Sequence, residues 1–239
     1  MRRNRQASWL RALACGLMFL VAAVGAADDV LVTGNVRFSD LDGSADDHDG
    51  VANGTFTVDD GNLTIAGTIS CNDDLPLPSF ASACDITIVV SGSVLMEPGS
   101  AILAENLRGL GNGGAVTLDV GSTVTLLGAS GTTSGARIST AQVTGAGGPF
   151  AFGGAIEIVA GGFDLGVGAV VSSSATAGMA GEIAVAAGGD AVVEGLVAAG
   201  PSTTVLAGAS SDGAVLEGNA LFSSGGDIEL RAESGSLVV

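Results

Sequence analysis

The densest group of side chains that could bind a metal ion is an acidic segment near the N-terminus. It holds five aspartates within ten residues: Asp40, Asp42, Asp46, Asp47 and Asp49. Hard cations such as Ca²⁺ take about six to eight oxygen ligands, and loops rich in Asp and Gly supply them. The spacing is not that of an EF-hand, because no Glu closes the loop. The segment is interpreted either as a Ca²⁺ site or as a solvated acidic loop, and no other cofactor is expected.

Residues 1–26 are predicted to form a secretory signal peptide. Arginines lie at positions 2, 3, 5 and 11, an apolar run covers residues 12–24, and small residues precede a cleavage point after Ala26. The alternative is a membrane anchor, but the run is shorter than the roughly 20 residues that a spanning helix needs. We therefore expect an exported chain, located outside the cell, on its outer surface or in the periplasm, with no membrane span after cleavage.

Cys71 and Cys84 are the cysteines that remain once the signal peptide is removed. An even pair in an exported chain predicts a disulfide bond, with two free thiols as the alternative. The bond would close a loop over residues 72–83. A metal site at these cysteines is not expected, because His48 is the single histidine of the chain.

Other motifs that could bind a ligand or catalyse a reaction give only weak signals. Residues 109–114 are rich in glycine, like a phosphate-binding loop, but such a loop needs a helix after it. The residues that follow, 115–118, alternate as in a strand, so a turn is predicted instead. Arg108 and Arg137 lie in glycine-rich stretches without matching acidic clusters. We therefore expect no catalytic constellation.

The composition indicates which elements position these side chains. The chain is 47% hydrophobic but only 4% aromatic, and it contains 39 glycines. Aliphatic residues and glycine suit narrow, stacked strands rather than a compact globule built around aromatic rings. The net charge is −17 and the chain has no lysine, so its surface repels nucleic acid and anionic lipid.

A short strand led by two glycines recurs along the chain, as in residues 153–158, Gly-Gly-Ala-Ile-Glu-Ile. We expect the glycines to turn the chain and the alternating residues to form a strand. The equivalent apolar pair is found at Val30/Val32, Phe56/Val58, Ile86/Ile88, Val116/Leu118, Ile156/Ile158, Ile183/Val185 and Ile228/Leu230. A second strand follows each pair, and a third short apolar piece follows in most repeats. Successive pairs are 26–45 residues apart, and repeats of about 20–50 residues are typical of solenoids.

Three strands per repeat predict an all-β fold, a right-handed parallel β-helix of about six coils. One coil cannot bury its apolar face alone, so neighbouring coils must stack. An antiparallel β-sandwich is the alternative, because its strands have similar spacing. Glu194 breaks the pattern, since it lies where Leu126 and Val167 would point inward. We expect a local register change that turns Glu194 outward, because a buried Glu is costly without a partner.

The longer repeats carry their extra residues after the third strand, at 130–153 and 200–225. The loop between Cys71 and Cys84 lies at the same phase of the repeat. Insertions in solenoids collect on one face, and that face often binds a partner. The spacing therefore predicts three loops that leave one corner of the helix.

The repeats at residues 153–165 and 181–199 resemble those of bacterial secreted parallel β-helix proteins, namely filamentous haemagglutinin-type adhesins, autotransporter passenger domains and polymorphic outer-membrane proteins. The resemblance covers about residues 54–239 and implies an adhesive protein at the cell surface. We expect a signal peptide at 1–26, a first coil or cap with the acidic loop at 27–52, and repeats at 53–239. The chain stops at Val239 inside an expected strand, as a C-terminally truncated chain would, and the open edge at 236–239 predicts end-to-end self-association.

The expected function is structural or adhesive: an exported β-helix that presents loops to a glycan or another surface partner, and not to nucleic acid. The alternative is a carbohydrate-binding or carbohydrate-cleaving β-helix. An enzyme is not expected, because hydrolases need two carboxylates close together. Acidic residues such as Glu157, Glu182 and Glu229 stand singly at outward strand positions.

Overall fold

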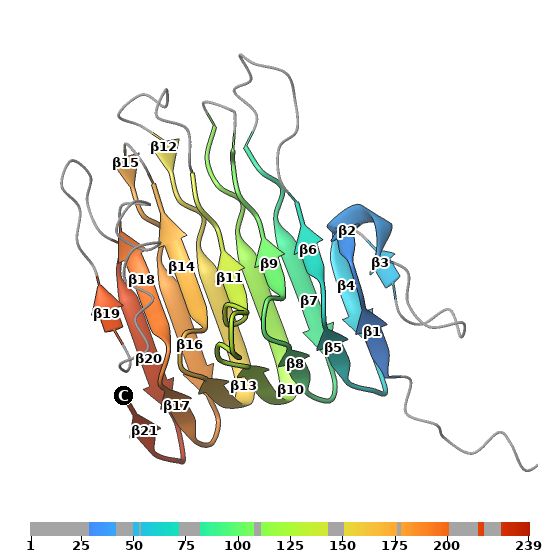
Figure 1. Ribbon diagram of the computed structural model, residues 1–239, viewed down its shortest axis with the longest axis vertical. Helices are drawn as coiled ribbons and strands as arrows, with labels where there is room; N and C mark the ends of the chain where they lie inside the picture. The colour runs from blue at the N-terminus through green and yellow to red at the C-terminus, as the bar shows by residue number, and fades with distance from the viewer. Residues whose placement is uncertain are drawn as a thin grey trace, which may run out of the picture.

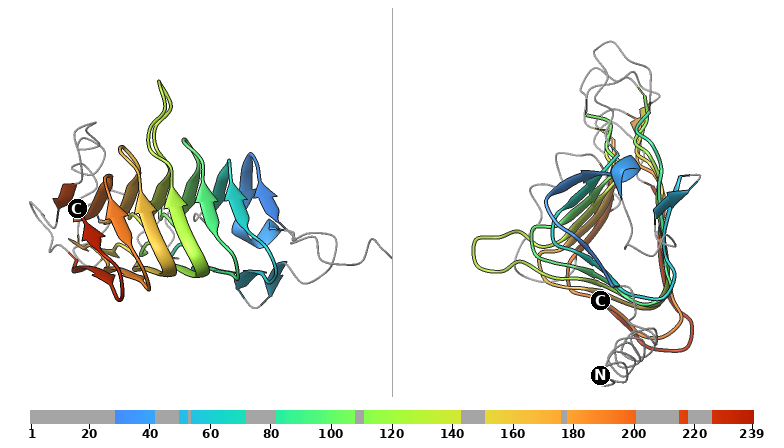
Figure 2. Two further views of the ribbon diagram at one scale, coloured as in Figure 1. Left: turned by 90° about the horizontal axis from the view of Figure 1, so that it is seen from below. Right: turned by 90° about the vertical axis from the view of Figure 1, so that its right-hand side faces the viewer.

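The computed structural model describes residues 29–41, 50–52, 54–71, 82–107, 111–142, 151–175, 178–200, 215–217 and 226–239. Apart from one short 3-10 helix, η1 (Phe38–Asp40), the regular elements of these residues are β-strands. The strands stack in parallel, coil upon coil, along three faces of a triangular prism (Figures 1 and 2). The predicted parallel β-helix is therefore confirmed, and the alternative of an antiparallel sandwich is wrong. The expected signal peptide lies outside the described residues.

Each face is a ladder of strands in consecutive coils. The first face holds β4 (Thr55–Val58), β7 (Ile86–Val90), the first half of β10 (Val116–Leu126), the first half of β13 (Ile156–Leu165), β16 (Ile183–Ala187) and β20 (Ile228–Ala232). The second face holds β1 (Val30–Val32), β5 (Leu63–Ile65), β8 (Val94–Met96), the second halves of β10 and β13, β17 (Ala191–Val193) and β21 (Leu237–Val238). The third face holds β2 (Asn35–Arg37), β6 (Thr68–Ser70), β9 (Ala101–Leu103), β11 (Arg137–Ser139), β14 (Val170–Ser174), β18 (Leu196–Gly200) and β19 (Val215–Glu217).

Four short elements lie outside these ladders: η1, β3 (Gly50–Ala52), which runs antiparallel to β4, and the two strands of a small sheet, β12 (Ala151–Phe152) and β15 (Gly178–Met179). The first face thus has six parallel strands, as the expected number of coils requires. None of the described residues forms a helix that is long and apolar enough to cross a membrane.

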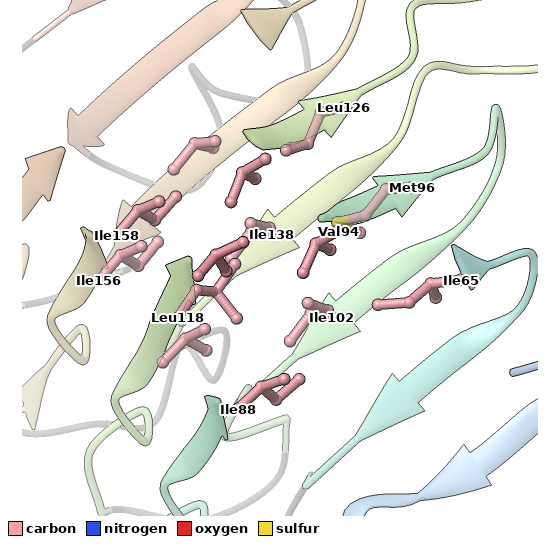
Figure 3. Close-up of a cluster of buried hydrophobic side chains, with 14 of the residues drawn as sticks. Ile65, Ile88, Val94, Met96, Ile102, Leu118, Leu126, Ile138, Ile156 and Ile158 are labelled. Carbon is pink, nitrogen blue, oxygen red and sulfur yellow. The ribbon is translucent and has the colours of Figure 1, made fainter. Parts of the chain in front are cut away.

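The core is a set of aliphatic ladders inside the prism. Because side chains alternate along a strand, every second residue of each face points inward. Ile65, Met96 and Leu126 lie in register on the second face, and each is fully buried (Figure 3). The third face adds Ile102 and Ile138 in the same way. Narrow aliphatic side chains fit this interior, which explains the low aromatic content of the sequence.

A column of glycines explains the recurring Gly-Gly pattern. Gly114, Gly154, Gly181 and Gly226 stand two residues before the first-face strands of successive coils. A Cβ atom at any of them would lie well inside 3.0 Å of the backbone of the preceding coil. None of the four has a positive φ, so a left-handed backbone conformation is not the reason for glycine at these positions. They are glycines because the backbones of adjacent coils approach too closely for a side chain.

The register of the first coils differs from the expected one. Phe56 pairs with Ile88 and not with Ile86, which shifts the coil of β4 by two residues. Val30 pairs with Leu63, so β1 belongs to the second face. Both errors arise because two apolar residues with one residue between them fit more than one register. A shift of two residues, or a move to another face, still points both side chains inward.

Glu194 is exposed, as expected, and the inward position next to Leu165 is taken by Val193. The local register change therefore removes the cost of a buried carboxylate. Val167 was expected to point inward with Leu165, but it is exposed, because the second face ends at Leu165.

Candidate functional site: the loop corner

One corner of the prism lies between the end of the third face and the start of the first face, and the described ends of most insertions lie there. We call it the loop corner. The described chain ends that lie there are Leu41, Cys71 and Ser82, Leu107 and Gly111, Gln142 and Ala151, Ala175 and Gly178, and Glu217 and Gly226. In Figure 2 the described strands extend beyond the triangular core at this corner. The predicted gathering of loops at one corner is thus observed for the described ends of two of the three expected insertions. The third, 200–225, was expected as one loop, but β19 lies within it and pairs with β18 on the third face.

The extra residues of the coil that contains β10 and β11 are divided between two corners. The sequence indicated one insertion at 130–153, because β11 was not recognised as a strand. β11 pairs with β9 and β14, so it completes the third face of this coil. Residues before it form a hairpin, closed by mutual backbone hydrogen bonds between Ser130 and Thr133, at the corner between the second and third faces. Residues 143–150, the rest of the expected insertion, lie outside the described residues, and the flanking Gln142 and Ala151 lie at the loop corner.

Beyond the third face the chain continues as two walls that face each other. Asn106, Gln142 and Ala175 bridge in parallel on one wall, and β12 pairs with β15 on the other. The hydroxyls of Thr140 and Ser173 cross the space between the walls. Each donates a hydrogen bond to the carbonyl oxygen of Gly154, at 2.6 and 2.8 Å.

These crossing residues are almost completely buried. Buried hydroxyls that are satisfied by hydrogen bonds hold the two walls at one separation. The loop corner is therefore a rigid base for the segments that leave it.

A charged cluster lies on the outer side of the same wall. The carboxylate of Glu105, which is buried, forms an ion pair with the guanidinium of Arg137. The hydroxyl of Ser139 donates a hydrogen bond of 2.6 Å to Glu105 Oε1. Arg137 has no acidic cluster near it in the sequence, and this single acidic partner was not predicted. The partner lies 32 residues earlier in the chain, and the pairing of β11 with β9 brings the two segments together.

This cluster is suited to structural support more than to chemistry. Burial lowers the pKa of the Arg137 guanidinium, but an arginine with a lowered pKa still carries its proton at neutral pH. The ion pair neutralises the buried carboxylate, and loss of one partner of a buried pair costs about 3–5 kcal/mol in general. Among the described residues, no three His, Cys, Asp or Glu side chains lie close enough to hold a metal ion. The cluster therefore ties β9 and β11 together below the loops.

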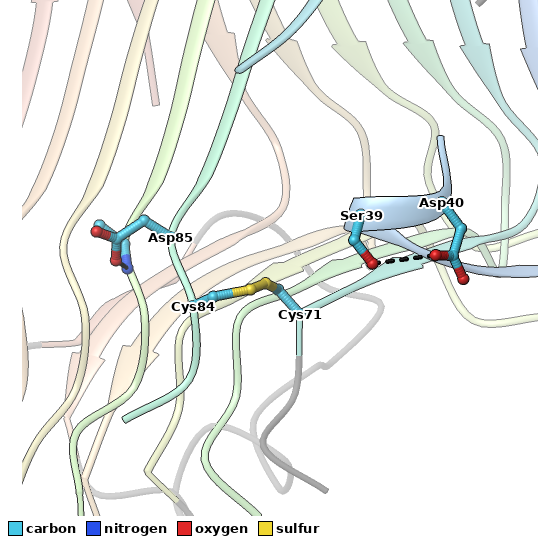
Figure 4. The surroundings of a disulfide bond; sticks show 6 residues. Ser39, Asp40, Cys71, Cys84 and Asp85 are labelled. Carbon is cyan, nitrogen blue, oxygen red and sulfur yellow. Dashed lines mark hydrogen bonds between the residues drawn. A yellow bond between two sulfur atoms is a disulfide. The ribbon is translucent and has the colours of Figure 1, made fainter. Parts of the chain in front are cut away.

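The disulfide between Cys71 and Cys84 is present, as predicted, and lies at the loop corner (Figure 4). It joins the end of β6 on the third face to the residues that lead into β7 on the first face. The Cα atoms are 5.4 Å apart, and the amide of Cys84 donates a hydrogen bond to the carbonyl oxygen of Cys71. The bond fixes both ends of the segment 72–81, and it is consistent with an oxidising, exported location.

Of the five aspartates proposed to bind Ca²⁺, only Asp40 belongs to the described residues. It ends η1, and its carboxylate accepts a hydrogen bond of 3.1 Å from the hydroxyl of Ser39 (Figure 4). Asp42, Asp46, Asp47 and Asp49 lie outside the described residues. The Ca²⁺ site therefore stays a prediction.

The loop corner also exposes large apolar side chains, which the sequence did not indicate. Phe152 and Met179 pair across β12 and β15, and both are exposed, at 38% and 46%. Leu107, at the end of the other wall, is 40% exposed. Exposed apolar groups that lie together are typical of surfaces that contact a partner.

The comparisons with known proteins give no relative. No protein-family model matches the chain, no curated protein matches it, and no solved structure matches it. The argument for function therefore rests on the residues and on the arrangement of the coils.

Proposed function

We propose that the protein is an exported adhesive β-helix, whose coils are a scaffold and whose loop corner binds a glycan or another surface partner outside the cell. One observation carries this proposal: the described ends of most insertions, which vary in length from coil to coil, lie at the same corner of the prism. A solenoid whose sole role is spacing has no need to direct its insertions to one side. Exposed Phe152 and Met179 add apolar contact area at that corner.

Binding is favoured over cleavage of a carbohydrate by the state of the acidic groups. A glycosidase needs an acid and a base on two carboxyl groups about 5–10 Å apart around the scissile bond. At the described part of the loop corner, the buried carboxylate is Glu105, and Arg137 and Ser139 already occupy it. Asp85, at the edge of the corner, accepts a hydrogen bond from the amide of Ala115.

The test compares two insertions of the same coil. In one variant residues 143–150, whose flanking residues lie at the loop corner, are replaced by Gly and Ser with the length unchanged. In the matched variant residues 130–134, in the hairpin at the other corner, are replaced in the same way. Each chain is applied to a glycan array, and a reducing-sugar assay is run in parallel.

We expect binding by the original chain, a loss of at least about tenfold in affinity for the 143–150 variant, and little change for the 130–134 variant. Binding that survives replacement at the loop corner, or is lost only with the hairpin, would contradict the proposal. Turnover that disappears when a single acid is changed to Ala would show an enzyme instead.

A further inference from the structure

The two ends of the prism are finished differently. At the N-terminal end, β3 runs antiparallel to β4, and Phe38 and Leu41 pack against the core. At the C-terminal end, β20 is the outermost of the described strands of the first face. Its inward residue Ile228 is only half-buried, whereas Ile183, one coil earlier in the same register, is fully buried. Among the described residues, the last coil therefore presents partly exposed apolar side chains and an edge of β20 that no other strand pairs with.

The side chains of β20 alternate in a self-complementary way. Ile228, Leu230 and Ala232 point inward, while Glu229 and Arg231 are exposed on the outer side. Arg231 Nη2 lies 3.8 Å from Glu233 Oε1 of the same chain, and both side chains are more than half exposed. An exposed ion pair of this kind contributes about 0–1 kcal/mol, so Arg231 can exchange it for another carboxylate.

We propose that the free edge of β20 pairs antiparallel with β20 of a second copy, about a two-fold axis at Leu230. In this register Glu229 of each copy lies opposite Arg231 of the other, which forms two cross-strand ion pairs. Leu230 lies opposite its own symmetry mate, and Ile228 lies opposite Ala232. The apolar interiors of the two prisms then become continuous, and the free edges are closed.

The side-chain pattern selects this register within β20. An axis between two residues would place inward side chains opposite outward ones. This register is unfavourable, because one side of the strand faces the apolar core and the other faces solvent. An axis at Glu229 would oppose two glutamates, and an axis at Arg231 would oppose two arginines, and like charges directly opposite each other are destabilising. The axis at Leu230 alone puts both charges of the strand opposite unlike charges.

The rest of the C-terminal end fits the same axis. A rotation about an axis through the middle of the first face exchanges the positions of the second and third faces. It therefore places β21 of one copy against β19 of the other, again antiparallel. Leu237 and Val238 of β21 are 44% and 53% exposed, and the second copy would cover them. Head-to-tail stacking is disfavoured on the first face, since β3 already pairs with the outer edge of β4 at the opposite end.

A charge-swap experiment tests this pairing. Glu229→Arg and Arg231→Glu each place like charges opposite each other in both pairs, whereas the double variant restores two unlike pairs. A mixture of the two single variants also restores them, because a chain with two arginines meets a chain with two glutamates. Glu157→Arg, at an exposed outward position in the middle of the same face, is the control. Circular dichroism verifies that each variant is folded.

In sedimentation velocity we expect a dimer for the original chain and a dissociation constant at least about tenfold higher for each single variant. The double variant and the equimolar mixture of single variants should return to dimers, and Glu157→Arg should leave the dimer unchanged. A monomer at about 100 μM, a dimer that ignores both single changes, or growth beyond a dimer through head-to-tail stacking would overturn the proposal.

Discussion

Replacement of Gly154 by Ala should unfold the protein at a markedly lower temperature. The added Cβ would overlap the carbonyl oxygen of Gly114 in the preceding coil. Backbone atoms cannot rotate away as a side chain can, so the two coils must separate locally. The hydrogen bonds that Thr140 and Ser173 donate to Gly154 would be strained at the same time. We expect a loss of about 3 kcal/mol or more in the free energy of unfolding, equivalent to a decrease of about 6–12 °C in Tm for a chain of this size.

Gly188→Ala provides the matched control for that variant. Gly188 lies at another corner of the prism, its φ is not positive, and a Cβ there would come no closer than 3.7 Å to any neighbour. The substitution should change the free energy of unfolding by less than about 1 kcal/mol, with a gain expected from the stiffer unfolded chain. Equal effects of the two substitutions in thermal or urea unfolding would show that close backbone approach is not the reason for the glycine column.

Removal of the disulfide should have an effect of similar size. The bond closes a loop with a sequence separation of 13 residues, and closure of such a loop stabilises a protein by about 3 kcal/mol in the chain-entropy model. Cys71→Ala and Cys84→Ala should each lose nearly all of this stabilisation, and the double variant should lose little more, because one change already breaks the bond.

Urea unfolding of the four chains, with and without a reductant, checks this expectation. Reduction should destabilise the original chain and leave the double variant unaffected. Additive losses in the two single variants, or an original chain that is insensitive to reduction, would argue that the two cysteines act as separate packing residues. The comparison also separates the bond from the packing of Cys71, which is the more buried of the two.

The alternation of apolar residues was sufficient to predict the fold, because inward and outward side chains alternate along a strand. Ile156 and Ile158 point inward and Glu157 points outward, as their spacing requires. The exact register was not predictable in the same way. Phe56 could face either Ile86 or Ile88, and only the stacking of whole coils decides between them. β11 was missed because Ile138 is its one inward aliphatic residue.

The place of the candidate site was predictable, but its contacts were not. The positions of the insertions within the repeat indicated one corner for the loops. The disulfide between Cys71 and Cys84 was predicted from the even number of remaining cysteines and from the expected export of the chain. The ion pair between Glu105 and Arg137 depends on the register of β9 against β11, which the sequence did not reveal. The role of Gly154 likewise depends on the distance between two coils, a quantity that has no local signal in the sequence.

The most direct test of the whole account measures the distance between coils in solution. Thr55, Thr87, Thr117, Glu157, Ala184 and Glu229 occupy one outward row of the first face, one residue per coil. Spin labels at Thr55 and Ala184 span four coil steps, and labels at Thr55 and Glu229 span five. Double electron–electron resonance, with the labelled chain diluted into unlabelled chain, gives both distances.

Because neighbouring strands lie about 4.8 Å apart, the account predicts separations of about 19 Å and about 24 Å, which differ by one strand spacing. Two equal separations, or a separation of Thr55 from Glu229 that is shorter than its separation from Ala184, would contradict a single directional stack of coils. Such a result would remove the basis for the loop corner and for every proposal that depends on it.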